Sequence, residues 1–229
     1  MKVYIGYDQR EQEAYRVAVS SLLKHASVPV EIVKLDAERL EQNGLLRRPQ
    51  DRRGGIYDIP SNANCSTDFA ISRFMVPLLA HEGFALFVDC DVVFLADVAE
   101  LFEQADPDKA VMVVKHKPLN ETGTKMDGQQ QLMYYRKNWT SVCIFNCNHP
   151  ANKRLSLQDI NERPGRDLHS FYWLNDSEIG SLTCDWNVLV NVQEMPIMPK
   201  LLHFTQGGPW LPTWQGAEHD EIWLEASRG

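Results

Sequence analysis

The sequence predicts a single α/β domain with a central, mostly parallel sheet flanked by helices, and three observations lead to this fold class. Residues 2–8 and 30–35 have the apolar and β-branched composition of strands. Residues 12–25, which lie between them, repeat apolar side chains at helical spacing. A strand, a helix and a strand joined by short segments form a βαβ unit, whose two strands are parallel. The length of 229 residues and the hydrophobic fraction of 44% suit one generous domain.

The remaining elements are predicted from the same periodicities. The helix at 12–25 is expected to bury the face formed by Ala14, Val17, Ala18, Ser21 and Leu22. Residues 41–64 are polar and rich in arginine, which predicts a solvated loop or a flexible flap beside a site. Helical spacing returns over 67–81, and the wholly apolar run 84–88 is typical of a buried central strand. Further strands are predicted at 92–94, 110–114, 141–146 and 201–205, and a helical turn at 98–102.

Composition argues against several function classes. A net charge of −8 makes non-specific binding to nucleic acid or anionic lipid a poor fit. The five cysteines are irregularly spaced and form no CxxC pair, which favours free thiols over a disulfide framework or a structural zinc site. The N-terminal residues show no signal-peptide pattern, and no apolar run approaches the roughly 20 residues that span a bilayer. We therefore expect a cytoplasmic protein without a transmembrane segment.

The most informative segment is ALFVDCDVVFL, residues 85–95, in which two acids interrupt an apolar strand. Burying unpaired carboxylates is costly, and two of them close together repel each other. A bound cation relieves both costs, and ligands of open α/β sheets bind at the carboxyl ends of the strands. Residues i and i+2 point to one side of a straight strand, so Asp89 and Asp91 are predicted to address a single ion. The alternative is a strand that ends in a turn, with the acids capping the next segment.

Two other segments support a site at this edge. SRFMVPLL places Arg73 on a helix just upstream of the two acids. PKLLHFTQGGPW sets His203 in an apolar strand, followed by Gly207 and Gly208. A lone histidine in such a strand is more often a satisfied core residue, but adjacent glycines let the backbone approach a ligand closely. The balance therefore shifts towards a ligand role for His203.

In their order along the chain, these residues resemble the retaining glycosyltransferases of family eight, which include glycogenin and bacterial lipopolysaccharide galactosyltransferases. The resemblance covers nearly the whole chain, and it rests on the order and spacing of several loose motifs. Besides Arg73, the matching segments are YIGYD at 4–8, FVDCDVVF at 87–94, SVCIFNCN at 141–148, WLNDSEIG at 173–180, DWNVL at 185–189 and LLHFTQGGPW at 201–210.

The resemblance implies a GT-A fold, in which Asp89, Asp91 and His203 would hold one divalent ion against the diphosphate of a nucleotide sugar. The expected ion is Mn²⁺ (or Mg²⁺), because mixed carboxylate and imidazole ligation suits Mn²⁺ better than Ca²⁺. The ion would also neutralise donor charge in a chain that is itself acidic. The expected donor is a UDP-linked sugar, and the expected acceptor is a carbohydrate or another hydroxyl compound.

The resemblance also assigns further residues to the site. The donor would be bound by the two acids together with Tyr7, Asp8, Arg73, Gly207 and Gly208. Asn146 would face the donor sugar, and Asp176 or Glu178 would be the nucleophile if transfer used a covalent intermediate. Front-side attack without a protein nucleophile is the favoured route. Residues 1–115 would mainly bind nucleotide and metal, and residues 116–229 would supply the acceptor half and the closing metal motif.

The sequence departs from the family pattern at two places. The loop at 173–180 lacks the family's usual Asp-Gln pair. The lysine that usually precedes the closing Pro-Trp is replaced by Gly208, and the candidates to supply the missing charge are Lys125, Lys137 and Lys200. Residues 125–139, rich in amides and aromatic rings, form either a surface helix or a sugar-binding face. Two of five tryptophans are expected to line the acceptor cleft: Trp139, Trp173, Trp186, Trp210 and Trp214.

Three other classes fit the sequence less well. The run 87–93 fits the opening motif of haloacid-dehalogenase-like phosphatases, with Asp89 as nucleophile, but no later acidic pair accompanies it. A sugar-nucleotide pyrophosphorylase needs a glycine-rich loop after its first strand, which residues 6–15 lack. The non-enzymatic alternative is a carbohydrate-binding relative of the same fold, against which three intact metal ligands argue.

Overall fold

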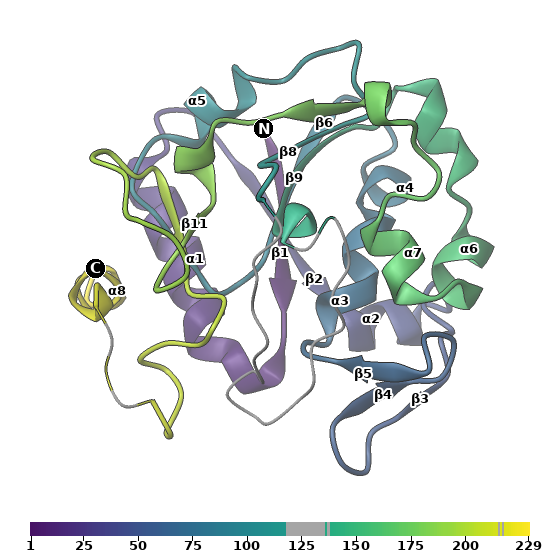
Figure 1. Ribbon diagram of the computed structural model, residues 1–229, viewed down its shortest axis with the longest axis horizontal. Helices are drawn as coiled ribbons and strands as arrows, with labels where there is room; N and C mark the ends of the chain where they lie inside the picture. The colour runs from purple at the N-terminus through teal and green to yellow at the C-terminus, as the bar shows by residue number, and fades with distance from the viewer. Residues whose placement is uncertain (118–135, 137, 215, 217) are drawn as a thin grey trace.

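The computed structural model describes residues 1–117, 136, 138–214, 216 and 218–229, and it confirms the predicted α/β class (Figure 1). The described residues form a main sheet of six strands. Across the sheet these are β10 (Ile179–Ser181), β8 (Val111–Val113), β9 (Val142–Asn146), β6 (Phe84–Val88), β1 (Lys2–Tyr7) and β2 (Glu31–Asp36). β9 runs antiparallel to its neighbours β6 and β8, and the other pairs are parallel. The sheet is therefore mostly parallel, and its ligand-binding edge lies where β1 and β6 end.

The N-terminal βαβ unit has the predicted bounds and the predicted buried face. α1 spans Gln12–His25, and its buried residues are Ala14, Val17, Ala18, Ser21 and Leu22. It packs on β1 and on the C-terminal helix α8 (Asp220–Ser227). Figure 1 shows α1 on one side of the sheet and four helices gathered on the other: α3 (Phe69–Ser72), α4 (Val76–Ala80), α6 (Leu157–Glu162) and α7 (Gly165–His169). Two short helices follow strands: α2 (Ala37–Gln42) and α5 (Val98–Phe102).

The helix predicted over 67–81 is broken in the structure. A 3₁₀ turn, Arg73–Met75, separates α3 from α4. The cause is Pro77, which lacks an N–H and whose ring would clash with the carbonyl of Arg73 in a continuous α-helix. The Arg73 side chain folds back onto this broken segment, where its Nε donates to the carbonyl of Ala70 at 3.1 Å.

A second sheet joins distant parts of the chain. It contains β11 (Val188–Leu189), β12 (Leu201–His203) and β7 (Val92–Phe94), with β12 in the middle. β7 pairs antiparallel with β12, which sets His203 opposite Val92. The segment 89–91 is the link between β6 of the main sheet and β7 of this one. The straight strand predicted through Asp89 and Asp91 is therefore wrong, since the chain leaves the first sheet between them.

Residues 41–64 are more ordered than a solvated loop. They contain β3 (Gln50–Asp51) and β4 (Ile56–Asp58), which form an antiparallel sheet with β5 (Ala63–Cys65). Arg48 and Asp58 form an ion pair whose side chains are both fully buried. Arg48 Nη1 also donates to the carbonyl of Ile160 at 2.8 Å, which ties this small sheet to α6. The prediction of a solvated loop is wrong because two of the charged residues, Arg48 and Asp58, pair with each other in the interior.

Candidate functional site

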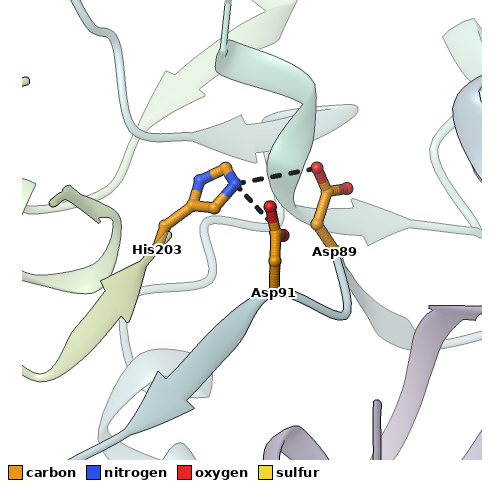
Figure 2. A group of neighbouring side chains, drawn as sticks. All are labelled: Asp89, Asp91 and His203. Carbon is orange, nitrogen blue, oxygen red and sulfur yellow. Dashed lines mark ion pairs between the residues drawn. The ribbon is translucent and has the colours of Figure 1, made fainter. Parts of the chain in front are cut away.

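Three side chains from two separate segments meet at the ligand-binding edge (Figure 2). His203 Nε2 lies 3.2 Å from Asp91 Oδ1 and 3.9 Å from Asp89 Oδ2. One ligand atom from each residue lies within 4.8 Å of the other two, which is a spacing that a single metal ion can span. Both carboxylates are largely buried, and the His203 side chain is 3% exposed. The sequence-based prediction that these three residues converge is confirmed, although the acids lie on a link between sheets.

A hydrogen-bonded chain determines which nitrogen of His203 faces the acids. Ser141 Oγ donates to the carbonyl of Asn138 at 2.8 Å and therefore accepts from Asn187 Nδ2 at 3.0 Å. This fixes the Asn187 amide so that its Oδ1 lies 3.0 Å from His203 Nδ1. Nδ1 thus carries a proton, and Nε2 in the neutral ring presents its lone pair to the cluster. A buried amide that orients a histidine in this way is typical of the residues that support a metal ligand.

Asn187 was not among the predicted site residues. It lies in the segment 185–189, which resembles the family, but the resemblance assigns no role to the Asn187 amide. It is fully buried, and it follows a 3₁₀ turn, Cys184–Trp186, that leads into β11. The sequence signal was a polar residue between Trp186 and Val188, both of which are buried.

Arg73 acts on the site through Asp89. Its Nη1 lies 2.9 Å from Asp89 Oδ1 and donates to the carbonyl of Thr140 at 2.9 Å. The guanidinium is nearly buried against the rings of Phe69 and Phe87. It therefore holds one oxygen of Asp89 and leaves the other on the side of His203. The structure shows this orienting contact, and direct contact of Arg73 with a donor stays a prediction.

Tyr7 and Asp8 lie at the same edge, at the end of β1. Asp8 is fully buried, and its carboxylate accepts hydrogen bonds from Arg10 and from the backbone N–H of Asp68. Burial alone would raise the pKa of Asp8, but the hydrogen bonds from Arg10 and Asp68 lower it below the ordinary value. Asp8 thus fastens the start of α3 to the end of β1. The ring of Tyr7 is half-buried, with the ammonium of Lys34 3.2 Å from its centroid.

Glu11 lies close to the cluster and is the fourth carboxylate described at this edge, after Asp8, Asp89 and Asp91. The Cys90 thiol donates to Glu11 Oε2 at 3.4 Å. Burial, followed by the charges of Asp91 and Asp8, raises the pKa of Glu11 to about 7. Negative charge is therefore concentrated around Asp91, and a cation bound there would relieve it.

Glycine is favoured at positions 207 and 208 of the closing motif for two different structural reasons. Gly207 has a φ of +109°, a backbone conformation that other residues rarely adopt. A Cβ at Gly208 would lie 2.2 Å from the ring of Trp210, so a side chain there would displace the indole. Trp210 packs in turn on Phe204, one residue beyond His203. A contact of either glycine with a donor stays a prediction.

Asn146 and Glu178 lie at the opposite edge of the sheet. Because β9 is antiparallel to β6, Val142 pairs with Val88, and Asn146 pairs with Phe84 at the far end. Four residues of strand amount to about 13 Å. Asn146 Nδ2 donates to the carbonyl of Pro107 at 2.9 Å, so its amide supports a loop there. This placement argues against the predicted contact of Asn146 with a donor held beside Asp89.

The same topology argues against Glu178 as a nucleophile. Its carbonyl accepts from the N–H of Ala110, just ahead of β8, and β8 begins at that far edge. Its carboxylate accepts from the N–H of Asn175 and pairs with Arg154, which lowers its pKa. Asp176 is exposed and paired with Arg136, and its catalytic role stays a prediction.

The predictions for tryptophan and lysine side chains are partly resolved. Trp173 and Trp186 are buried in the core, Trp210 packs on Trp223, and Trp139 is half-buried beside the cluster. Lys200 is paired with Glu100 and Asp185, which leaves it poorly placed to replace the missing lysine. The rest of the predicted sugar-binding segment, 125–135 and 137, lies outside the described residues, and with it Lys125 and Lys137.

Comparison with solved structures defines the fold as GT-A. The apo glycosyltransferase GlyE of Streptococcus pneumoniae superposes with a TM-score of 0.60 at 15% identity, covering 99% of this chain and 59% of GlyE. This chain thus spans less than two thirds of GlyE. The galactosyltransferase LgtC, in complex with donor and acceptor sugar analogues, gives a TM-score of 0.58 at 14% identity, covering 100% of this chain and 95% of LgtC. The GT-A fold implied by the sequence is confirmed.

Comparison of sequences gives the family. Protein CDI of Arabidopsis thaliana is 41% identical over 229 residues, which cover 97% of this chain and 84% of that protein. The chain belongs to the family of Protein CDI. No family model matches the sequence.

None of the helices in the described residues has the length and apolar character needed to cross a bilayer.

Proposed function

We propose that this chain is a metal-dependent glycosyltransferase that moves a sugar from a UDP-linked donor to a hydroxyl acceptor. The observation that carries the proposal is the meeting of Asp89, Asp91 and His203 at the carboxyl edge of a GT-A sheet. The solved neighbours include LgtC, which was crystallised with donor and acceptor sugar analogues. The order of motifs in this chain resembles that of family eight, and the proposal therefore includes the retaining chemistry of that family.

The donor atoms fit a divalent cation of the Mn²⁺ or Mg²⁺ type. Two carboxylates and one neutral imidazole nitrogen form a mixed oxygen and nitrogen set. The Asn187 amide holds the ring in the tautomer that leaves Nε2 towards the carboxylates. When bound, such an ion supplies Lewis-acid stabilisation of the diphosphate leaving group.

The residues of the chain would divide the remaining tasks along the sheet edge. Residues 1–115 would contribute Tyr7 and the end of β1 to the nucleotide side, while residues 116–229 would contribute the acceptor side and His203. Arg73 would keep Asp89 turned towards the cation. Front-side attack needs no nucleophile from the protein. Glu178 is held at the far edge and Asp176 is paired with Arg136, so neither residue is well placed to act as one. Their arrangement supports that route.

A thermal-shift experiment tests the proposal. UDP-glucose or UDP-galactose together with Mn²⁺ is expected to raise the midpoint of unfolding by about 5–10 °C at a hundredfold excess over Kd. The nucleotide sugar alone, or Mn²⁺ alone, is expected to give a much smaller shift. UDP released from the donor only when Mn²⁺ is present would separate an enzyme from a carbohydrate-binding relative. Release of phosphate from an aryl phosphate without any effect of UDP-sugars would instead favour a phosphatase that uses Asp89.

The Asn187 amide provides a second prediction. Asn187→Ala removes the acceptor for the Nδ1 proton, and it is expected to weaken Mn²⁺ binding by about 10–100-fold. Titration calorimetry measures the affinity directly and does not depend on the identity of the sugar. The matched control is Asn152→Ala, a buried amide that bonds the carbonyls of Ala110 and Asn146 at the opposite edge. Equal affinities for Mn²⁺ in the two variants would show that Asn187 does not support the site.

A further inference from the structure

His116 has a buried ring nitrogen that does not belong to the cluster of Asp89, Asp91 and His203. It follows β8 by three residues, at the same edge of the sheet as Asp89. The ring is half-buried, and among the described residues no hydrogen-bond partner reaches its buried Nε2. Leaving a buried polar atom without a partner is costly, so such an atom in a site indicates a group that a ligand satisfies.

The contacts of Trp139 place the backbone of His116 beside the proposed catalytic site. Trp139 Nε1 donates to the carbonyl of His116 at 2.9 Å. Trp139 also begins the 3₁₀ turn Trp139–Ser141, and the carbonyl of Ser141 accepts from the N–H of Asp89 at 3.0 Å. The hydroxyl of Ser141, in the same turn, accepts from the Asn187 amide, whose Oδ1 lies 3.0 Å from His203 Nδ1. One short turn therefore links His116 to both the acidic and the imidazole ligands.

The position of His116 in the sheet distinguishes it from the nucleotide side. β1, which carries Tyr7, lies on one side of β6, and β8 lies on the other side beyond β9. A donor whose nucleotide covers the end of β1 and whose diphosphate reaches Asp89 and Asp91 would extend its sugar towards β8. We propose that His116 binds a sugar hydroxyl next to the metal cluster and so helps to select the sugar. This inference rests on the proposed function.

The charge state of His116 favours a hydroxyl over a phosphate. Burial is the main cause that lowers the pKa of His116 to about 4, so the ring is neutral near pH 7. A neutral imidazole has one donor and one acceptor, which suits a hydroxyl group. Two cations near His116 are engaged: Lys115 Nζ donates to the carbonyl of Ile179 at 2.8 Å, and Arg136 pairs with Asp176. The hydroxyl can belong to the donor sugar or to the acceptor.

Two variants of His116 and one neighbouring control test this inference. His116→Ala removes the hydrogen-bonding group, and His116→Gln places an amide near the position of Nε2. Lys117→Ala changes an exposed residue next to it. The measurements are calorimetric binding of UDP and of UDP-glucose or UDP-galactose with Mn²⁺, and the rate of UDP release with and without a panel of simple sugar acceptors.

His116→Ala is expected to bind UDP with Mn²⁺ within twofold of the unchanged protein and to release UDP at least tenfold more slowly. His116→Gln is expected to recover part of the rate, and Lys117→Ala is expected to behave as the unchanged protein. Weaker binding of the UDP-sugar would assign the hydroxyl to the donor, and a raised KM for acceptor alone would assign it to the acceptor.

Two results would overturn the inference while the proposed function stands. One is an unchanged rate of UDP release in His116→Ala, with and without acceptors. The other is a loss of UDP and Mn²⁺ binding, or of thermal stability, as large as the loss of rate and not recovered by His116→Gln. If the unchanged protein binds neither UDP nor UDP-sugars with Mn²⁺, the proposed function fails, and the role of His116 fails with it.

Discussion

Asp91→Asn should reduce the rate of sugar transfer by about 10²–10³-fold and abolish measurable Mn²⁺ binding at micromolar concentrations. The substitution keeps the shape of the side chain but removes one negative oxygen from a cluster in which Asp91 Oδ1 lies 3.2 Å from His203 Nε2. A neutral amide oxygen is a weaker ligand for a divalent cation than a carboxylate. Calorimetry with Mn²⁺ and the metal-dependent rate of UDP release are the two measurements.

Stability without metal distinguishes this loss from unfolding. Asp91 lies close to Asp89 and Glu11, so removing its charge relieves repulsion. The unfolding midpoint of Asp91→Asn in chelator is therefore expected at or above that of the unchanged protein. The control is Asp97→Asn, in which asparagine can still accept the capping hydrogen bond from Ala99. Unaltered Mn²⁺ affinity in Asp91→Asn would show that the cluster is not the metal site.

Arg48→Ala should lower the free energy of unfolding by about 3–5 kcal/mol. Both side chains of the Arg48–Asp58 pair are fully buried, with Arg48 Nη2 2.6 Å from Asp58 Oδ2. Removing the cation leaves a carboxylate in the interior without its partner, and it also frees the carbonyl of Ile160. Urea denaturation followed by circular dichroism measures the loss.

Two companion variants separate burial from charge. Arg53→Ala removes an exposed ion pair with Asp51 in the same small sheet, and it is expected to leave stability unchanged. The double variant Arg48→Met with Asp58→Leu removes both buried charges and is expected to be more stable than Arg48→Ala alone. If Arg48→Ala and Arg53→Ala have equal effects, the buried pair does not stabilise the small sheet.

The parts of the fold that local periodicity determines were predictable from the sequence. α1 has the predicted bounds and buried face because its apolar residues recur every three or four positions. The strand at 84–88 was equally clear, since an unbroken apolar run suits a strand with both faces covered. The meeting of Asp89, Asp91 and His203 was predicted from the cost of isolated buried charges and from the resemblance to a known family.

The direction of a strand and the partners of buried polar groups were not predictable in this way. The sequence of β9 has the same apolar character whether it runs parallel or antiparallel to β6, and its actual direction moves Asn146 to the wrong edge. Periodicity also does not show that Asn187 and His203 would meet across β11 and β12. The composition of residues 41–64 predicts a solvated loop because the sequence alone does not show that Arg48 and Asp58 pair in the interior.

The link at 89–91 has a consequence for assembly of the protein. Two of the cluster's residues are made first, and His203 follows on β12, 112 residues after Asp91. A nascent chain paused before that point would carry the two acids without their imidazole partner. A cation bound to all three would then hold β12 against the link at 89–91, so occupancy of the site would require β12 to be in place.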